Sequence, residues 1–146
     1  MIEDDFERQD FYIDDEGIGK SEDYRQDMTK KALQFAMSLI KNDTSVSNIV
    51  FLCSTKEKGY QWLPSKLFDS LWNYSQQDNN IQYRATSLQT YRKCCHYYDI
   101  VICMGCFSSA LNTLDRYTNI KYIISLPWIK AMNEDWILRN NATKIK

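Results

Sequence analysis

Glycine is scarce in this chain, and histidine is almost absent. Of the 146 residues only four are glycine and only one, His96, is histidine. Neither G-x-G-x-x-G nor G-x-x-x-x-G-K-[ST] occurs, so the chain lacks the glycine-rich loops that cradle nucleotide phosphates. A single histidine also leaves little that titrates near neutral pH for acid–base catalysis. The sequence therefore predicts no cofactor and favours a binding or regulatory domain over an enzyme, with enzymatic activity left open.

Long apolar runs and a basic leader are also missing. No stretch approaches the roughly 18–20 apolar residues of a membrane span. The first ten residues, MIEDDFERQD, are acidic, the opposite of a signal peptide's start. The five cysteines are an odd number and lie in or beside apolar segments. We therefore expect a cytoplasmic protein with reduced cysteines and no membrane contact.

Charge is divided unevenly along the chain, although the formal net charge is only −1. Residues 1–27 contain 11 acidic and three basic residues, whereas residues 28–146 contain eight acidic and 15 basic residues, a balance of +7. We expect residues 1–20 to form an acidic, mobile N-terminal segment and residues 21–146 to form a single α/β domain. That segment either solubilises the chain or engages a basic surface, on this molecule or on a protein partner.

Apolar residues recur in a pattern that alternates between helices and buried strands. Helical spacing predicts a first helix that begins after Ser21 and ends near Lys41. Mostly apolar runs of strand length follow it, namely Asn48–Cys53, Ile81–Ala85, Ile100–Met104 and Lys121–Ile124. Helices are expected after each run, opened by Pro64, by Ser87, by Ser108 or Ser109, and by Pro127.

This alternation predicts the fold class. Strands that are apolar throughout are covered on both faces, and strands separated by helices run parallel. We therefore expect an α/β fold of three layers, Rossmann-like or flavodoxin-like, with helices on both faces of a mostly parallel, four-stranded sheet. Residues 11–13 would add a fifth strand at an edge of that sheet.

Hydroxyl-bearing residues and lysines follow the C-terminal ends of the predicted strands. Open parallel sheets bind ligands at that edge, where hydroxyls, helix N-termini and lysines favour anions. We expect a phosphate-bearing small molecule or a macromolecular partner to bind there. The candidate ligand-binding residues are Ser54, Thr55, Lys56, Lys58, Thr86, Ser87, Ser108, Ser109 and Trp128. Serine and threonine are also the ordinary helix caps, so the alternative is that these residues only cap helices.

Cys53 is the candidate catalytic residue if the chain catalyses a reaction. It ends the first apolar run, where the dipole of a following helix would lower the pKa of a thiol. Cys53 and Ser54, with the order of strands and helices over residues 48–140, resemble the EIIB domains of the sugar phosphotransferase system (lactose/cellobiose type). In those domains a cysteine at the end of the first strand carries a phosphoryl group. The resemblance implies that Cys53 acts as a phosphoryl carrier or as the thiol of an enzyme.

The other cysteines predict neither a redox centre nor a metal site. Cys103 and Cys106 form a C-x-x-C sequence at a strand end, but Cys103 is expected to point into the core. Cys94, Cys95 and His96 are adjacent on a predicted helix, where neighbouring side chains diverge by about 100°.

A nucleic-acid accessory protein is a further alternative. The basic balance of residues 28–146 and the ten tyrosines suit contacts with phosphates and stacking on bases. Lysines and arginines are nevertheless scattered singly rather than clustered.

Overall fold

The computed structural model describes residues 7–14, 22–53, 82–91, 98–127 and 130–145. They contain six strands: β1 (Gln9–Tyr12), β2 (Val46–Cys53), β3 (Gln82–Ser87), β4 (Tyr98–Met104), β5 (Ile120–Leu126) and β6 (Thr143–Lys144). The helices are α1 (Glu22–Asn42), α4 (Ser108–Asn112) and α5 (Glu134–Asn140), with two short 3₁₀ helices, η1 (Thr113–Arg116) and η2 (Lys130–Asn133). None of the helices in these ranges is both long enough and apolar enough to cross a membrane.

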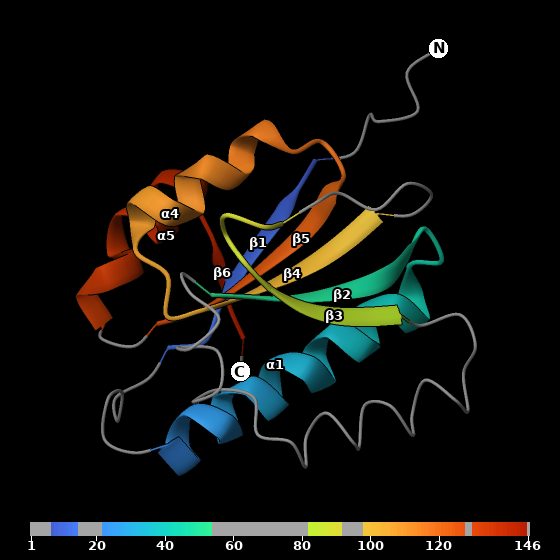
Figure 1. Cartoon of the computed structure of the whole chain (residues 1–146), viewed down its shortest axis with the longest axis horizontal. Helices are drawn as coiled ribbons and strands as arrows, with labels where there is room; N and C mark the ends of the chain where they lie inside the picture. Colours follow the sequence, from blue (N-terminus) through green and yellow to red (C-terminus); the bar gives the residue numbers. More distant parts are fainter. Residues whose placement is uncertain (1–6, 15–21, 54–81, 92–97, 128–129, 146) are drawn as a thin grey trace.

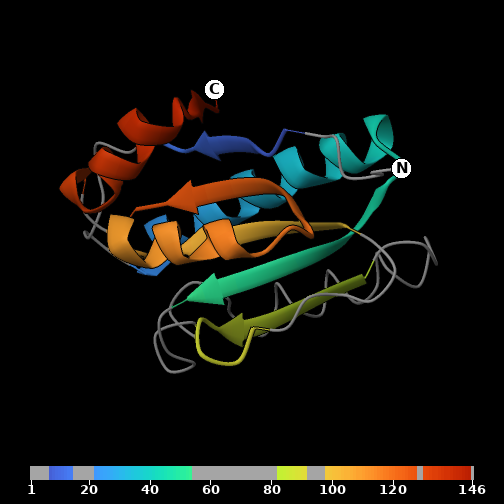
Figure 2. The same ribbon diagram turned by 90° about the horizontal axis from the view of Figure 1, so that it is seen from above.

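The strands form one sheet in the order β3-β2-β4-β5-β1-β6, and every neighbouring pair is parallel. Helix α1 covers one face of the sheet, and α4 and α5 cover the other (Figures 1 and 2). The expected three-layer α/β class is therefore confirmed, with six strands in place of four or five. The four apolar runs all form strands, with ends within two residues of those expected.

The sheet explains why its strands are apolar throughout. Alternate residues of β2 enter two different cores, because successive side chains of a strand point to opposite faces. Ile49 and Phe51 pack on the side of α1, where the small residues Ala32 and Ala36 let the helix approach closely. The residues that alternate with Ile49 and Phe51 along β2 pack on the other side of the sheet, against Trp136 of α5. Both faces are thus buried, as expected for a parallel sheet.

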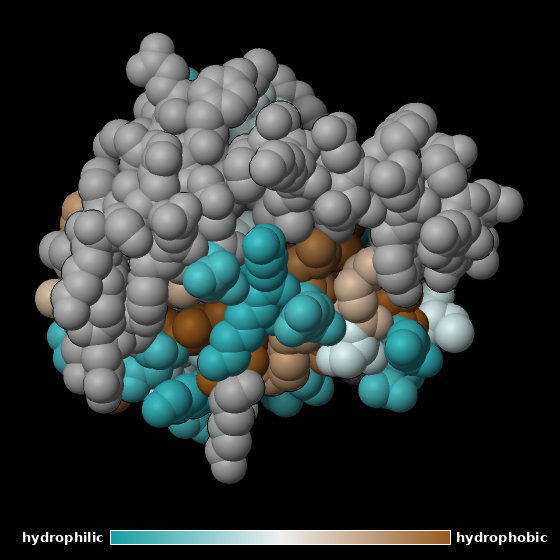
Figure 3. All heavy atoms as spheres, turned by 90° about the horizontal axis from the view of Figure 1, so that it is seen from below, coloured by the Kyte–Doolittle hydropathy of each residue, from teal (hydrophilic) through white to brown (hydrophobic). Residues whose placement is uncertain are grey.

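The outer side of α1 is mixed in character. Figure 3 views the molecule from below the orientation of Figure 1 and shows hydrophobic residues lying between hydrophilic ones on this side. The apolar residues of α1 that are only partly buried are Leu33, Phe35, Met37, Leu39 and Ile40.

Strand β1 lies within residues 1–20, the segment that was expected to be acidic and mobile. It lies inside the sheet rather than at an edge, paired with β5 from Gln9 opposite Tyr122 and with β6 at Phe11 opposite Thr143. The ring of Phe11 also packs edge-on against Phe35 of α1, with centroids 4.8 Å apart. Part of the acidic N-terminal segment therefore belongs to the α/β domain. The residues of β1 favour a strand only weakly by themselves, and the strand forms because it pairs with β5 and β6, which are distant in the sequence.

Candidate functional site

The C-terminal ends of β2 and β4 meet at a topological switch point. Strand β2 has β3 on one side and β4 on the other, and the order then continues through β5. In open parallel sheets, ligands bind beyond the carboxyl ends of the strands at such a switch point. Cys53 ends β2 and Met104 ends β4, so the residues that follow them are the candidates for a ligand site.

The turn after β4 is pinned to its neighbour and presents an aromatic ring. Gly105 has φ 64°, a left-handed conformation that glycine adopts without the steric cost of a Cβ. Its N–H donates to the carbonyl oxygen of Leu126 in β5 at 2.7 Å. Phe107 then begins α4 with 59% of its surface exposed. A rigid turn thus holds a solvent-facing ring at the candidate edge.

Ser108 and Ser109 have different environments despite being neighbours. The Ser108 hydroxyl donates to the carbonyl oxygen of Met132 at 3.2 Å and accepts from the N–H of Trp136 at 3.0 Å. Trp136 is in the first turn of α5, whose N–H groups lack partners within the helix. Ser108, which belongs to α4, therefore caps the N-terminus of α5. Ser109 is the exposed residue of the two.

Thr86 and Ser87 belong to a hydroxyl cluster at the end of β3. The Thr90 hydroxyl lies 2.6 Å from that of Thr86 and 2.9 Å from that of Ser87. The N–H of Leu88 donates to the carbonyl oxygen of Cys53 at 3.0 Å, which ties the ends of β3 and β2 together. Residues 88–90 form a turn in place of the expected start of a helix. The hydroxyls of this cluster hydrogen-bond to one another, which stabilises the turn.

The three cysteines of this region are buried. Cys53 is 2% exposed and packs in the core on the side of α1. Cys103 lies in the core on the other side, as expected, and burial raises the pKa of its thiol well above the ordinary value. The sulfur of Cys106 lies 4.0 Å from the carbonyl oxygen of Leu52. Both cysteines of the C-x-x-C sequence therefore pack in the core on the side of α5.

Asn133 is a polar residue of this region that the sequence did not indicate. It is buried, and its side-chain N–H donates to the hydroxyl of Ser125 in β5 at 2.9 Å. Among the described residues, none donates a hydrogen bond to its Oδ1. An unsatisfied buried acceptor costs about 1–3 kcal/mol. The sequence signal that could have pointed to Asn133 is its position directly before the acidic first turn of α5.

The remaining candidates lie outside the described residues. These are Ser54, Thr55, Lys56, Lys58 and Trp128, together with Cys94, Cys95 and His96. Among the residues that the structure describes, no group of three or more His, Cys, Asp and Glu side chains could hold a metal ion.

A polar cluster around Asp43 fixes the turn between α1 and β2. Its carboxylate accepts from Lys121 and from the Tyr122 hydroxyl, each at 2.7 Å, and from the Ser45 hydroxyl at 2.6 Å. Burial opposes ionisation, but these donors outweigh it and lower the pKa of Asp43. Burial and the bond to Asp43 raise the pKa of Tyr122 to about 12. The cluster joins the N-terminal ends of β2 and β5, away from the switch point.

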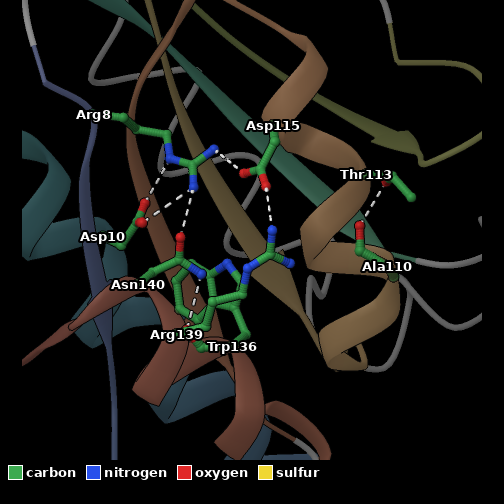
Figure 4. A network of polar contacts seen from close by, with 8 residues as sticks. All are labelled: Arg8, Asp10, Ala110, Thr113, Asp115, Trp136, Arg139 and Asn140. Atoms are coloured by element: carbon green, nitrogen blue, oxygen red, sulfur yellow. Dashed lines mark hydrogen bonds and ion pairs between the residues drawn. The ribbon is translucent and has the colours of Figure 1, made fainter.

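Arg8 organises a second cluster, which joins β1 to the helices on the face of α5 (Figure 4). Its guanidinium contacts both carboxylate oxygens of Asp10, at 2.8 and 3.2 Å, and reaches Asp115 of η1 at 2.8 Å. It also donates to Asn140 of α5 at 3.5 Å. Burial raises the pKa of Asp10 despite the opposing effect of Arg8. All three partners contact the guanidinium of Arg8, which thereby links β1 to η1 and α5.

Comparison of the chain with protein-family models, with curated proteins and with solved structures gave no match.

Proposed function

We propose that this chain is a non-catalytic binding domain that recognises a phosphate-bearing small molecule at the C-terminal edge of its sheet. The observation that carries the proposal is the switch point between β2 and β4, since open parallel sheets bind ligands at such points. The described residues that follow β3 and β4 at this edge include hydroxyls and an exposed ring but no histidine, aspartate or glutamate. That composition supports recognition rather than acid–base catalysis.

The side chains of the edge indicate what the ligand would contain. Phe107 offers a ring for stacking, and Ser109 offers an exposed hydroxyl. The basic balance of residues 28–146 favours an anion. A nucleotide or a sugar phosphate combines these features.

The phosphoryl-carrier role implied for Cys53 is less well supported. A carrier thiol must meet a phosphoryl donor, whereas Cys53 is buried in the core beside α1.

The test is a thermal-shift screen of nucleotides and sugar phosphates, followed by calorimetric titration of any compound that raises the melting temperature. A ligand at about 100 times its Kd adds about 2.7 kcal/mol to the free energy of unfolding. Phe107→Ala and Ser109→Ala should each weaken binding several-fold. Leu138→Ala, which truncates a side chain 79% exposed on α5, should leave the affinity unchanged.

Two results would contradict the proposal. One is a screen in which no compound raises the melting temperature. The other is an equal loss of affinity in Leu138→Ala and Phe107→Ala, because a nonspecific effect of removing exposed apolar surface would then explain both.

A further inference from the structure

Strand β3 forms one end of the sheet and has a neighbouring strand on one side only. It pairs with β2 in register from Asn48 opposite Gln82 to Cys53 opposite Ser87. On its other side no strand of the described sheet lies against it (Figure 2). With six residues β3 is the longer of the two end strands, since β6 has two. An edge of this length can pair with a further strand.

The last hydrogen bond between β2 and β3 shows which residues of β3 face outward. The N–H of Leu88 donates to the carbonyl oxygen of Cys53, whose partner in the register is Ser87. Backbone groups of successive residues in a strand point to opposite sides, so every second residue before Leu88 also faces β2. The residues that direct their N–H and C=O groups to the free edge are therefore Tyr83, Ala85 and Ser87.

Ala85 is the open position on this edge. The turn after β3 occupies the outward groups of Ser87, because its N–H donates to the Thr90 hydroxyl at 3.2 Å and its carbonyl oxygen accepts from the N–H of Thr90 at 3.1 Å. Ala85 is exposed, and none of the described residues forms a hydrogen bond with its outward groups. Its methyl side chain leaves room for a second backbone. One donor and one acceptor are thus available at the middle of the edge.

Strand β6, at the other end of the sheet, lacks a comparable edge. The N–H of Ile145 donates to the carbonyl oxygen of Tyr12 at 2.8 Å, and Tyr12 is opposite Lys144 in the register. Of the two residues of β6, it is therefore Lys144 that faces outward. Its side chain is 54% exposed, and a lysine on a short edge strand opposes pairing. An added strand is therefore expected at β3 and not at β6.

We propose that β3 pairs antiparallel with β3 of a second copy of this chain, about a two-fold axis at Ala85. A two-fold contact uses the same surface on both copies. In this register the two Ala85 residues are opposite each other and exchange both backbone hydrogen bonds, as outward-facing residues of antiparallel strands do. Arg84 then lies opposite Thr86 of the second copy. An axis at Arg84 would instead place two like charges opposite each other, which is destabilising.

The same arrangement predicts that assembly stops at two copies. A head-to-tail contact, in which β3 of one copy pairs with β6 of the next, would extend the sheet without end. The outward lysine of β6 opposes that contact, whereas the two-fold contact uses both β3 edges and leaves none free. This inference does not depend on the proposed function.

The test is analytical ultracentrifugation of the full chain, with a reductant present, from about 1 μM to about 1 mM, where weak pairs dissociate. The expected result is an equilibrium between monomer and dimer. Ala85→Pro removes the N–H that donates to the second copy but no hydrogen bond to β2, since that N–H points away from β2. It should raise the Kd of the dimer at least about tenfold.

A second pair of variants keeps the test independent of proline. Ala85→Lys leaves the backbone groups in place but brings two like charges opposite each other, and should also raise the Kd at least about tenfold. Leu138→Lys adds the same charge to a side chain that is 79% exposed on α5, and should change the Kd less than about twofold. Circular dichroism at about 1 μM, where the chain is monomeric, establishes that each variant is folded.

Three results would overturn the proposal. The first is a chain that remains monomeric at about 1 mM. The second is a dimer whose Kd is the same in the wild type, in Ala85→Lys and in any folded Ala85→Pro protein. The third is a series of larger assemblies that grows with concentration, because a two-fold contact closes at two copies.

Discussion

At the residue scale, Asp99 places a carboxylate where solvent does not reach it. Its Oδ2 accepts from Tyr91 at 2.6 Å and from Asn119 at 3.0 Å, but no donor among the described residues reaches its Oδ1. The guanidinium of Arg84 is 3.9 Å from Oδ2 and partly exposed. Burial raises the pKa of Asp99, against the hydrogen bonds and the charge of Arg84 that lower it. The ionised form is therefore poorly compensated.

Replacing Asp99 by Asn should stabilise the protein at neutral pH. Because the pKa of Asp99 is raised on folding, the folded state binds this proton more tightly than the unfolded chain does. Stability contributed by this group is complete below the unfolded pKa of about 3.9 and is lost as pH rises through the folded pKa. Asparagine keeps an acceptor for Tyr91 and does not ionise. Urea unfolding should give Asp99→Asn a gain of about 1 kcal/mol at pH 7 and almost none near pH 4.

The opposite outcome has a definite meaning. If Asp99→Asn is less stable than the wild type at pH 7, the attraction between Asp99 and Arg84 outweighs the cost of burying the carboxylate.

At the scale of elements, β1 is a short strand with a large structural role. Four residues long, it separates β5 from β6 in the sheet. The N–H of Ile13, just after it, donates to the carbonyl oxygen of Ser125 at 3.2 Å, and the Ile13 side chain is buried on the side of α1. Arg8, just before it, joins it to η1 and α5. Removing β1 would leave β6 without a neighbour and uncover the edge of β5.

A chain that starts at Lys20 should therefore fail to fold. It loses β1, the Arg8 cluster and the buried Ile13, and the loss should equal or exceed a typical total stability of about 5–15 kcal/mol. A chain that starts at Glu7 retains β1 and Arg8 and should keep its fold. Far-ultraviolet circular dichroism and thermal melting compare the two chains. Equal melting temperatures would mean that β1 contributes nothing to stability.

At the scale of the whole molecule, stability should be highest in the middle of the sheet. The backbones of β2, β4 and β5 are paired with strands on both sides, and their side chains are buried on both faces. Strand β6 lies at one end of the strand order, contains two residues and exposes both of them. Regions that open at low free energy are those with few buried contacts. Unfolding should therefore start at the β6 end of the sheet.

Hydrogen exchange followed by mass spectrometry tests this order. Amides of β4 and β5 should exchange most slowly, at rates set by global unfolding, and those of β6 should exchange at least about a hundredfold faster. Exchange of β6 as slow as that of β4 would instead indicate that the sheet opens as a single unit.

The amino-acid sequence by itself determined the elements whose signals are local. Helical spacing predicted α1, and continuous apolar runs predicted β2, β3, β4 and β5, because periodicity within a segment reflects which faces it must bury. Alternation of those segments predicted a parallel sheet with helices on both faces. The burial of Cys103 followed from its place in an apolar run.

Tertiary structure alone decided what depends on partners distant in the chain. Strand β1 exists because Gln9 to Tyr12 pair with residues of β5 more than a hundred positions later. Ser108 caps a helix, as its residue type suggested, but the helix is α5 rather than its own. Ring contacts of Tyr91 with Arg84 and with Tyr117 join the turn after β3 to β3 and to the residue after η1, and no spacing in the sequence marks them. Such contacts depend on how the layers pack, whereas a sequence pattern reports only the neighbours along one segment.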